Sequence, residues 1–518
     1  MLLLLLYVGG FLALAGWLLP KEVKLNDRFA LRFFDLESVF VPAKANYADI
    51  SDIRQQFEVT DLSPANTAPA ATDTAQLAAA NTTAADSAAS LALRFAIQYP
   101  GGQDTLLFTF FRSLEQLAHK DTLIRVLHYG DSQIEGDRIT SFLRNKMQEK
   151  FGGCGVGLVP LLDPLGNRSS LIIRSDSYWK KFAAYGAEYR KSSPKHYGIM
   201  GSYFRYSVTT PKPAADSLLA IRDSVAAKNT ATATKIKPAS IDLMPSPMAY
   251  SRDSRFQNIK ILYGRNQKPF QLSISTAKGK EDKTLLDTAS VFGLYSYPVT
   301  DQFRKVHIAF EGKKSPELYG VALDCNAGVA IDNMPFRGSS GIEFTRMNRE
   351  LLQKQFKELN VKCIILQFGV NVVPYVTADY KFYERQFYNQ LKLLKRLHPD
   401  VSILVVGVSD MSRKEGELYA SYPNIEKIRD AQRNAAFKAG CAFWDLYTAM
   451  GGKDSMPSWV NATPALANKD FTHFTPKGAK IVSEMMYKAL MTEYEKFAKG
   501  KSDERLLGAK NMGGKGKG

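Results

Sequence analysis

The chain has 518 residues, which is more than one ordinary hydrophobic core accommodates, and its length predicts two folded units with additional segments. Hydrophobic residues make up 45% and charged residues 23%, proportions that exclude a wholly disordered or collagen-like chain. The net charge of +17 indicates an anionic partner or a solvated basic surface, and the absence of zinc-finger spacing or an RNA-binding signature argues against nucleic acid.

Residues 1–20 carry no charge and are almost wholly apolar, long enough to cross a bilayer core as a helix. They are interpreted as a transmembrane anchor or a signal peptide, and we favour the anchor because no basic segment precedes the apolar run. Either interpretation predicts export to the cell envelope, on the periplasmic side of a bacterial membrane, or secretion. Against export, Lys21, Lys24 and Arg28 follow the apolar run and are typical of a cytoplasmic flank.

Residues 21–61 are interpreted as a juxtamembrane segment, and residues 62–92 have the composition of a linker, rich in Ala, Thr and Ser and without aromatic residues. Such a segment buries too little apolar surface to order itself, so we expect it to separate everything before it from the folded part. At the other end, residues 499–518 form a Gly/Lys-rich tail that we expect to be disordered.

Short apolar runs alternate with amphipathic segments over most of the remaining chain. Strands are expected at residues 124–130, 321–326, 361–368, 402–408 and 441–447, and helices at residues 137–150, 342–359, 380–397, 425–438 and 476–497. This alternation predicts a doubly wound α/β domain with a parallel five-stranded sheet, covered by helices on both faces.

A β-rich module interrupts the α/β pattern, which divides that domain into residues 93–164 and 318–498. Within residues 165–317, β-leaning runs at 202–209, 259–263, 270–275 and 305–310 are separated by polar and Pro-containing loops. We interpret this insert as a β-sandwich or jelly roll.

The four cysteines are Cys154, Cys325, Cys363 and Cys441, and they contain no CxxC pair. A disulfide is possible but is not indicated by their spacing. Since there is also no HExxH motif, P-loop or paired Cys/His spacing, we expect neither a metal nor a cofactor.

Ligands of a doubly wound sheet bind outside the carboxyl ends of its strands, so the residues that follow each strand are informative. The candidate segments are Gly130-Asp131-Ser132-Gln133, Arg337-Gly338-Ser339-Ser340-Gly341, Gly369-Val370-Asn371 and, before the last helix, Asp470-Phe471-Thr472-His473. Each segment is common by itself. Their order along the chain, at one edge of one predicted sheet, makes them a candidate site.

The residue types in these segments suit nucleophilic catalysis. Ser132 needs a base to take its proton, His473 can act as that base, and Asp470 can orient the imidazole from one turn away. A tetrahedral oxyanion needs preorganised donors, which we assign to the backbone N–H of Ser132, the N–H of Gly341 and the side-chain amide of Asn371.

These blocks resemble those of the SGNH (GDSL) hydrolase superfamily, whose four naming residues match Ser132, Gly341, Asn371 and His473. The resemblance covers about residues 103–496 apart from the insert. It implies a flavodoxin-like fold and ester hydrolysis through an acyl-enzyme. The position of the β-rich module between the first two blocks further resembles bacterial peptidoglycan O-acetylesterases.

Two residues depart from the family pattern. Gln133 stands where Leu is usual, and Val372 stands where an acidic residue is common, so the substrate class stays open. Two charged neighbours of the motifs also need interpretation. We expect Asp131 to hold the turn through backbone hydrogen bonds, and Arg337 to bind an anionic group of the substrate or to form a surface salt bridge.

The resulting hypothesis is an acetyl- or short-acyl-esterase that acts on an O-acylated extracytoplasmic polysaccharide such as peptidoglycan, tethered to a membrane by its N-terminal segment. Transfer of the acyl group to a sugar hydroxyl by the same triad is one alternative. The other is a non-catalytic carbohydrate-binding protein in which the triad is misaligned. The distances between the three side chains distinguish the last alternative from the first two.

Overall fold

In this computed structural model, the described residues are 47–57, 93–187, 189, 194–207, 238–276, 281–299 and 305–513, together with 7, 8, 11, 22–26 and 29–32. The linker at residues 62–92 and most of the apolar segment 1–20 lie outside the described residues, so both stay predictions. Among the helices that are described, none combines the length and the apolar character needed to cross a membrane.

The α/β domain is built on a six-stranded sheet with the order β16-β4-β17-β18-β21-β3. Its parallel strands are β4 (Leu123–Gly130), β16 (Gly328–Pro335), β17 (Val361–Gln367), β18 (Ser402–Val406) and β21 (Ala442–Trp444). In space, β16, the second parallel strand along the chain, lies at the sheet edge outside β4, the first, which is the flavodoxin-like order. The predicted number of five parallel strands is confirmed. The sequence did not predict the short antiparallel edge strand β3 (Ile97–Gln98).

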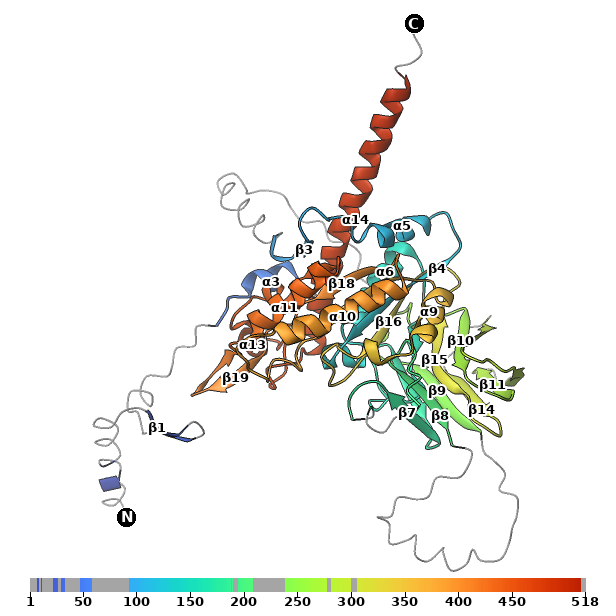
Figure 1. Cartoon of the computed structure of the whole chain (residues 1–518), viewed down its shortest axis with the longest axis horizontal. Coiled ribbons are helices and arrows are strands. Elements are labelled where there is room, and N and C mark those ends of the chain that lie inside the picture. The colour runs from blue at the N-terminus through green and yellow to red at the C-terminus, as the bar shows by residue number, and fades with distance from the viewer. Residues whose placement is uncertain are drawn as a thin grey trace, which may run out of the picture.

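Helices cover both faces of this sheet (Figure 1). One face carries α9 (Arg349–Glu358), α10 (Lys381–Leu397) and α11 (Ile425–Lys438), and the other carries α5 (Phe108–Gln116), α6 (Thr140–Phe151), α13 (Ser455–Asn461) and α14 (Pro476–Gly513). Along β17, Ile364 and Leu366 are buried under α9, α10 and α11. On the opposite face, Cys363 and Ile365 are buried under α5, α6, α13 and α14. Because both faces are buried, the strand is apolar without interruption from Cys363 to Leu366 and lacks the alternation of a half-exposed strand.

Smaller elements complete the domain near the carboxyl ends of the strands. They are the 3-10 turns η1 (Ser132–Asp137) and η2 (Phe344–Arg346), the hairpin of β19 (Ser412–Glu415) and β20 (Leu418–Ser421), and α12 (Leu446–Ala449). Short polar side chains cap the starts of helices in this domain. Asn348 accepts the backbone N–H of Leu351 at the start of α9, and Asp445 accepts that of Thr448 at the start of α12.

The second parallel strand was predicted in the wrong place, at residues 321–326. Those residues belong largely to β15 (Glu317–Asp324), which pairs antiparallel with β10 (Asn258–Gly264) in the β-rich module, whereas β16 lies beside β4. Both strands are largely apolar, and each carries one aspartate, Asp324 or Asp332, that pairs with the buried Arg125. Local pattern could not separate the two strands, because only tertiary pairing distinguishes them.

The β-rich module is a sandwich of two antiparallel sheets, as predicted. One has the order β13-β10-β15-β8-β7 with β5 beside β15, and the other has the order β12-β11-β14-β9-β6. The strands not yet given are β5 (Gly157–Val159), β6 (Leu171–Ser175), β7 (Trp179–Ala183), β8 (Ser202–Tyr206), β9 (Ala239–Pro245), β11 (Phe270–Thr276), β12 (Glu281–Leu286), β13 (Gly293–Pro298) and β14 (Val306–Glu311). Ile261 and Val321 of the first sheet share a core with Leu272 and Ile308 of the second. The strands of the module extend from Gly157 to Asp324, beyond the predicted limits of 165 and 317.

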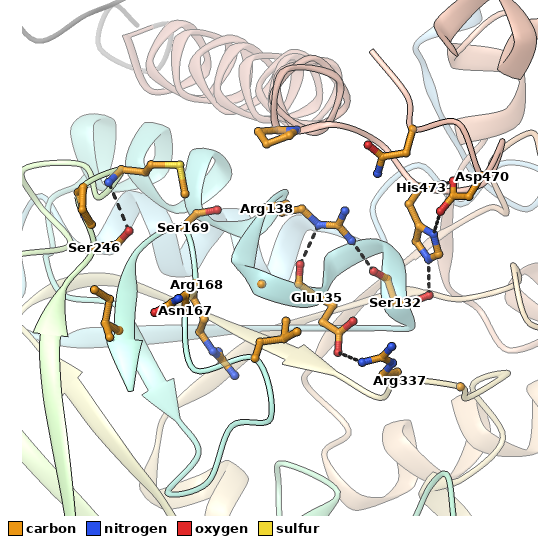
Figure 2. A pocket seen from close by; sticks show the side chains of 18 of the residues that line it. Ser132, Glu135, Arg138, Asn167, Arg168, Ser169, Ser246, Arg337, Asp470 and His473 are labelled. Atoms are coloured by element: carbon orange, nitrogen blue, oxygen red, sulfur yellow. Dashed lines mark hydrogen bonds and ion pairs between the residues drawn. The ribbon is translucent and has the colours of Figure 1, made fainter. Parts of the chain in front are cut away.

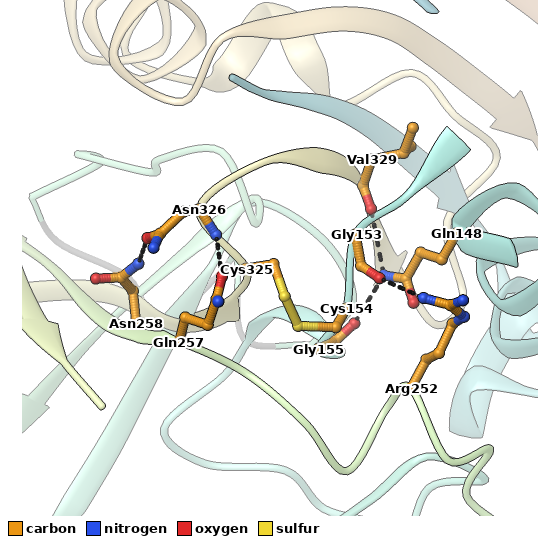
Figure 3. The surroundings of a disulfide bond; sticks show 10 residues. All are labelled: Gln148, Gly153, Cys154, Gly155, Arg252, Gln257, Asn258, Cys325, Asn326 and Val329. Atoms are coloured by element: carbon orange, nitrogen blue, oxygen red, sulfur yellow. Dashed lines mark hydrogen bonds between the residues drawn. A yellow bond between two sulfur atoms is a disulfide. The ribbon is translucent and has the colours of Figure 1, made fainter. Parts of the chain in front are cut away.

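A disulfide between Cys154 and Cys325 joins the two places where the chain passes between the units (Figure 3). Its Cα atoms lie 5.1 Å apart, just before β5 and just after β15, and the cysteine spacing had not indicated it. Nearby, the buried Arg144 of α6 forms ion pairs with Asp137, at 2.9 Å, and with Asp253 of the module, at 3.2 Å. Covalent and ionic contacts thus fasten the module to the α/β domain.

The segment before the linker was expected to be separate from the folded part, but it packs against it. Helix α3 (Ser51–Gln56) lies on the α/β domain, where Ile53 and Phe57 are buried in the same core as α5, α13 and α14. Asp52 forms an ion pair with Arg94 at 2.5 Å. Farther towards the N-terminus, β1 (Glu22–Asn26) and β2 (Phe29–Arg32) pair as an antiparallel hairpin.

The C-terminal segment also differs from its prediction. Helix α14 continues to Gly513, through most of the tail at residues 499–518 that was predicted to be disordered (Figure 1). Between the Gly/Lys-rich stretches, the tail contains Glu, Arg, Leu and Ala residues with good helix propensity, which the overall composition had obscured. Residues 514–518 lie outside the described residues.

Candidate active site

A cavity of about 1000 Å³ lies at the carboxyl ends of the parallel strands, between the α/β domain and the β-rich module (Figure 2). Its lining includes Ser132, Asn371, Asp470 and His473 from the α/β domain, and Leu165, Asn167, Ile172 and Met248 from the module. The cavity is therefore built by both units, and the residues singled out from the sequence for nucleophilic chemistry lie on one of its walls.

Three of these residues form a continuous hydrogen-bonded chain. The hydroxyl Oγ of Ser132 lies 2.8 Å from Nε2 of His473, and Nδ1 of His473 lies 2.8 Å from Oδ2 of Asp470 (Figure 2). Because the carboxylate can only accept, Nδ1 carries the imidazole proton and Nε2 is left to accept the serine hydroxyl proton. The structure therefore brings the predicted nucleophile, base and orienting carboxylate together in the order that proton transfer requires.

Asp470 is held in its charged form by its surroundings. Partial burial raises its pKa, but the hydrogen bonds from the backbone N–H and ring of His473 and from the backbone N–H of Thr472 outweigh burial and lower the pKa below its ordinary value. Both backbone groups donate to Oδ1 at 3.0 Å, which leaves Oδ2 for the ring. The local DxxH turn thus preorganises the carboxylate that orients the base.

The turn that presents Ser132 is fixed by its neighbour Asp131. The buried carboxylate of Asp131 accepts the backbone N–H of Gln133 at 3.0 Å, and it also accepts those of Gly369 at 3.0 Å and Val370 at 3.3 Å. Burial raises the pKa of Asp131 to about 7, although the backbone donors oppose this rise. The predicted structural role of Asp131 is confirmed, and the residue additionally joins the first block to the third.

Gly341, predicted as an oxyanion donor, does not line the cavity. It is buried, its N–H donates to Oγ of Ser339 at 2.9 Å, and an added Cβ would lie 2.8 Å from the ring of Phe368. Gly338 of the same loop does line the cavity, is exposed and has a φ of +78°. The assignment of Gly341 is therefore corrected: it is a packing residue, and Gly338 is the glycine whose backbone reaches the cavity.

A buried side-chain network holds this loop, and the sequence did not reveal it. Ser339 Oγ donates to the carboxylate of Glu343, which also accepts the backbone N–H of Ile342 at 2.8 Å. Burial raises the pKa of Glu343. Asn371, the remaining predicted donor, lines the cavity and donates from Nδ2 to the carbonyl of Ser339 at 2.9 Å. An amide has two N–H bonds, so the second is available to an oxyanion.

The other five histidines have structural contacts or, in the case of His119, lie towards solvent. His128 is buried between Thr140 and Gln367, and burial lowers its pKa to about 4. His196 and His307 pair with acidic residues of the module, and His398 contacts a backbone carbonyl.

Arg337 also follows one of its two predicted interpretations. Its guanidinium lies at the cavity, 3.6 Å from the carboxylate of Glu135, so it forms an exposed salt bridge there. Among the described residues, no group of three or more His, Cys, Asp or Glu side chains could hold a metal ion.

Comparisons with known proteins place the fold. No family model matches the sequence, and no curated protein matches it either. Among solved structures, a peptidoglycan O-acetylesterase matches with a TM-score of 0.57 and 17% identity over 75% of this chain and 96% of its own. This likeness confirms the predicted fold, a flavodoxin-like α/β domain with an inserted β module.

Two further solved structures match less closely. A salicylyl-acyltransferase from a tetracycline biosynthetic pathway has a TM-score of 0.26 and 11% identity over 63% of this chain and 98% of its own. A family two carbohydrate esterase from Clostridium thermocellum has a TM-score of 0.24 and 7% identity over 49% of this chain and 91% of its own.

Proposed function

We propose that this protein is a serine esterase that removes acetyl or other short acyl groups from an O-acylated polysaccharide, with peptidoglycan as the substrate to test first. The observation that carries the proposal is the hydrogen-bonded chain from Ser132 through His473 to Asp470, with successive separations of 2.8 Å, at the wall of an open cavity. A non-catalytic binding protein would not need this alignment of three side chains.

In the first half of the reaction, Nε2 of His473 takes the hydroxyl proton of Ser132 as Oγ attacks the carbonyl carbon of the ester. Asp470 stabilises the imidazolium that results. The negative charge that develops on the carbonyl oxygen is met by the amide of Asn371 and by the backbone N–H groups of Ser132 and Gly338. Losing one such donor typically costs about 2.7–4 kcal/mol of transition-state stabilisation.

The same residues complete the second half of the reaction. Nε2 of His473 returns its proton to the sugar oxygen as the C–O bond breaks, which leaves the acyl group on Ser132. A water molecule, deprotonated by His473, then attacks this acyl-enzyme. The carboxylic acid is released as the ester bond to Ser132 breaks and His473 returns the proton to Oγ of Ser132. If a sugar hydroxyl replaces the water, the product is a new ester, so hydrolysis and transfer differ only in the acceptor.

The shape of the cavity supports a polymeric substrate. Its two walls come from different folded units, and it is open to solvent at Gly338 and Met248, which are exposed. A cavity of about 1000 Å³ exceeds the volume of an acetyl group many times over, so most of it is left for the sugar part. The structural neighbour named as a peptidoglycan O-acetylesterase makes peptidoglycan the natural first choice.

We also propose that the protein acts outside the cytoplasm, on the periplasmic side of a membrane or secreted, and is tethered if the apolar segment 1–20 is retained. The disulfide between Cys154 and Cys325 supports this location, because such bonds persist in oxidising compartments. Fractionation of cells that express the protein, with detergent extraction of the membranes, tests both the location and the tether.

The catalytic proposal is tested with the purified protein, Ser132→Ala and His473→Ala. We expect the native protein to hydrolyse p-nitrophenyl acetate and to release acetate from O-acetylated peptidoglycan, and both variants to lose at least about 10³-fold in kcat. Equal rates in native protein and Ser132→Ala would refute the proposed nucleophile. Acyl transfer to an added sugar at the expense of acetate release would assign the protein as an acyltransferase.

A further inference from the structure

Two side chains from the turn that carries the nucleophile hold the peptide groups on either side of His473. Gln133 donates from Nε2 to the carbonyl of Thr472 at 2.6 Å, and Arg138 donates from Nη1 to the carbonyl of Phe474 at 3.1 Å. Thr472 and Phe474 are the residues immediately before and after His473. The backbone on both sides of the base is therefore held by two residues that follow Ser132 in the sequence, at one and six positions.

Arg138 makes two further contacts that connect this grip to Ser132. Its Nη2 donates to the carbonyl of Ser132 at 2.7 Å, and its Nε donates to the carbonyl of Glu135 at 2.9 Å (Figure 2). One planar guanidinium thus bonds to the nucleophile's own peptide and to the peptide after the base. Since the guanidinium plane is rigid, these bonds fix the two carbonyls relative to each other.

Gln133 makes a similar link to the backbone before His473. Its side chain is buried, and Nε2 also donates to Oγ of Ser409, which follows strand β18. The carbonyl oxygen of Thr472 can only accept a hydrogen bond. The NH2 end of the Gln133 amide must therefore face Thr472, which fixes the orientation of the amide. A leucine, which is usual at this position in the family that the chain resembles, has no donor for either contact.

We propose that Gln133 and Arg138 are positioning residues that set the distance and direction between Ser132 Oγ and His473 Nε2. Neither side chain touches the reacting atoms, and both act through the backbone of the Asp470–His473 turn. Burial lowers the pKa of Arg138, although the negative charges of Glu135 and Asp470 oppose this shift, and the buried guanidinium bonds to three carbonyls. The inference rests on the proposed esterase function.

The alternative is that these bonds only satisfy buried carbonyls, as many side chains do. Gln148 provides a matched control for that role, because it is a buried glutamine whose Nε2 donates to the carbonyls of Gly155, at 3.1 Å, and Val329, at 3.2 Å (Figure 3). It lies on α6 and does not line the cavity. Replacing either glutamine with methionine removes two hydrogen bonds and nearly preserves the length of the side chain.

The experiment compares Gln133→Met, Arg138→Met, Arg138→Lys and Gln148→Met, each first shown by thermal unfolding to be folded at the assay temperature. We expect kcat for p-nitrophenyl acetate to fall roughly 10- to 100-fold in Gln133→Met and Arg138→Met, with KM nearly unchanged, because sub-ångström to ångström misplacement of a base has this effect. Arg138→Lys keeps the charge and one donor direction and should recover part of the loss. Gln148→Met should keep the native kcat.

Crystal structures of Gln133→Met and Arg138→Met provide a readout that does not depend on activity. The proposal expects the Oγ–Nε2 separation to increase beyond hydrogen-bond range, about 3.5 Å. An unchanged separation together with a kcat equal to that of Gln148→Met would overturn the positioning role and leave the esterase proposal intact. If native protein and Ser132→Ala were equally active, the esterase proposal would fail, and the separations would still decide whether these residues position His473.

Discussion

The carboxylate of Asp131 accepts the backbone N–H of Gly369 at 3.0 Å, and this bond joins the carboxyl end of β4 to that of the neighbouring strand β17. The same carboxylate caps the turn that begins at Ser132 by accepting the N–H of Gln133. One buried group therefore holds together the nucleophile turn and the loop that carries Asn371. Protonation of Asp131 should therefore affect both the turn that begins at Ser132 and the loop that carries Asn371.

The stability of the protein should depend on pH through Asp131. Its pKa in the folded protein is about 7, above the value of 3.8 for a free side chain, so the folded state binds a proton more tightly than the unfolded state. The resulting stabilisation is present below pH 4 and is lost as the pH rises towards 7, at up to about 1.4 kcal/mol per pH unit. Asp131→Asn, which resembles the protonated form, should lack this change.

Thermal unfolding of the native protein and Asp131→Asn at pH 5 and pH 8 measures the effect. We expect the native protein to lose more stability than the variant between these two values. A difference in Tm that stays constant across this range would show that Asp131 has the same proton affinity in both states.

Asp470→Asn should weaken catalysis without unfolding the protein. The N–H groups of Thr472 and His473 point at Oδ1, so the amide oxygen of the variant takes that place and its NH2 group faces Nδ1 of the ring. A donor at that position favours the wrong imidazole tautomer, and we expect kcat to fall about 10²- to 10⁴-fold.

Asp379→Asn is a suitable control for Asp470→Asn, because Asp379 likewise accepts a backbone N–H, that of Lys381, but lies outside the cavity lining. Steady-state kinetics of both variants on p-nitrophenyl acetate test the prediction. A native rate in Asp470→Asn would mean that backbone contacts alone orient His473.

The two glycines of the loop after β16 should respond differently to substitution by alanine. A Cβ at Gly341 would lie 2.8 Å from the ring of Phe368, whereas a Cβ at Gly338 has no neighbour within 4 Å. Both have positive φ, which costs about 1–2 kcal/mol for alanine. We expect Gly341→Ala to lower Tm more than Gly338→Ala does. Relative to the fall in Tm, we expect the fall in kcat to be larger in Gly338→Ala than in Gly341→Ala. The reverse pattern would restore Gly341 as the residue that contacts the substrate.

The interface between the module and the α/β domain should depend on Arg144. Its guanidinium is buried and pairs with Asp137 and Asp253, so Arg144→Met leaves two buried carboxylates without their cation and should cost about 3–5 kcal/mol. On the same helix, Lys146 pairs with Glu149 in solvent, and Lys146→Met should cost about 0–1 kcal/mol. Chemical denaturation of both variants measures the two costs, and similar values would mean that the buried pairs contribute no more than the exposed one.

Much of the α/β domain and of the triad could be predicted from the sequence, for local reasons. Apolar runs of strand length and amphipathic helical periods are local properties, and they located four of the five parallel strands. Ser132, Asp470 and His473 could be found because the ends of parallel strands meet at one sheet edge, wherever each strand lies in the order.

The tertiary structure alone decided the rest. Two adjacent apolar strands, β15 and β16, have similar sequences, and only their pairing partners assign them to different sheets. Gly338 and Gly341 are the same residue type in the same loop. Only the tertiary structure shows that Gly341 packs against the ring of Phe368, whereas Gly338 has no neighbour within 4 Å of an added Cβ. Gln133 and Arg138 reach carbonyls more than 300 positions away, and no local pattern contains such contacts. The sequence by itself determined which chemical groups are present and in which order, whereas the tertiary structure determined which of them meet, because side-chain contacts depend on distance in space.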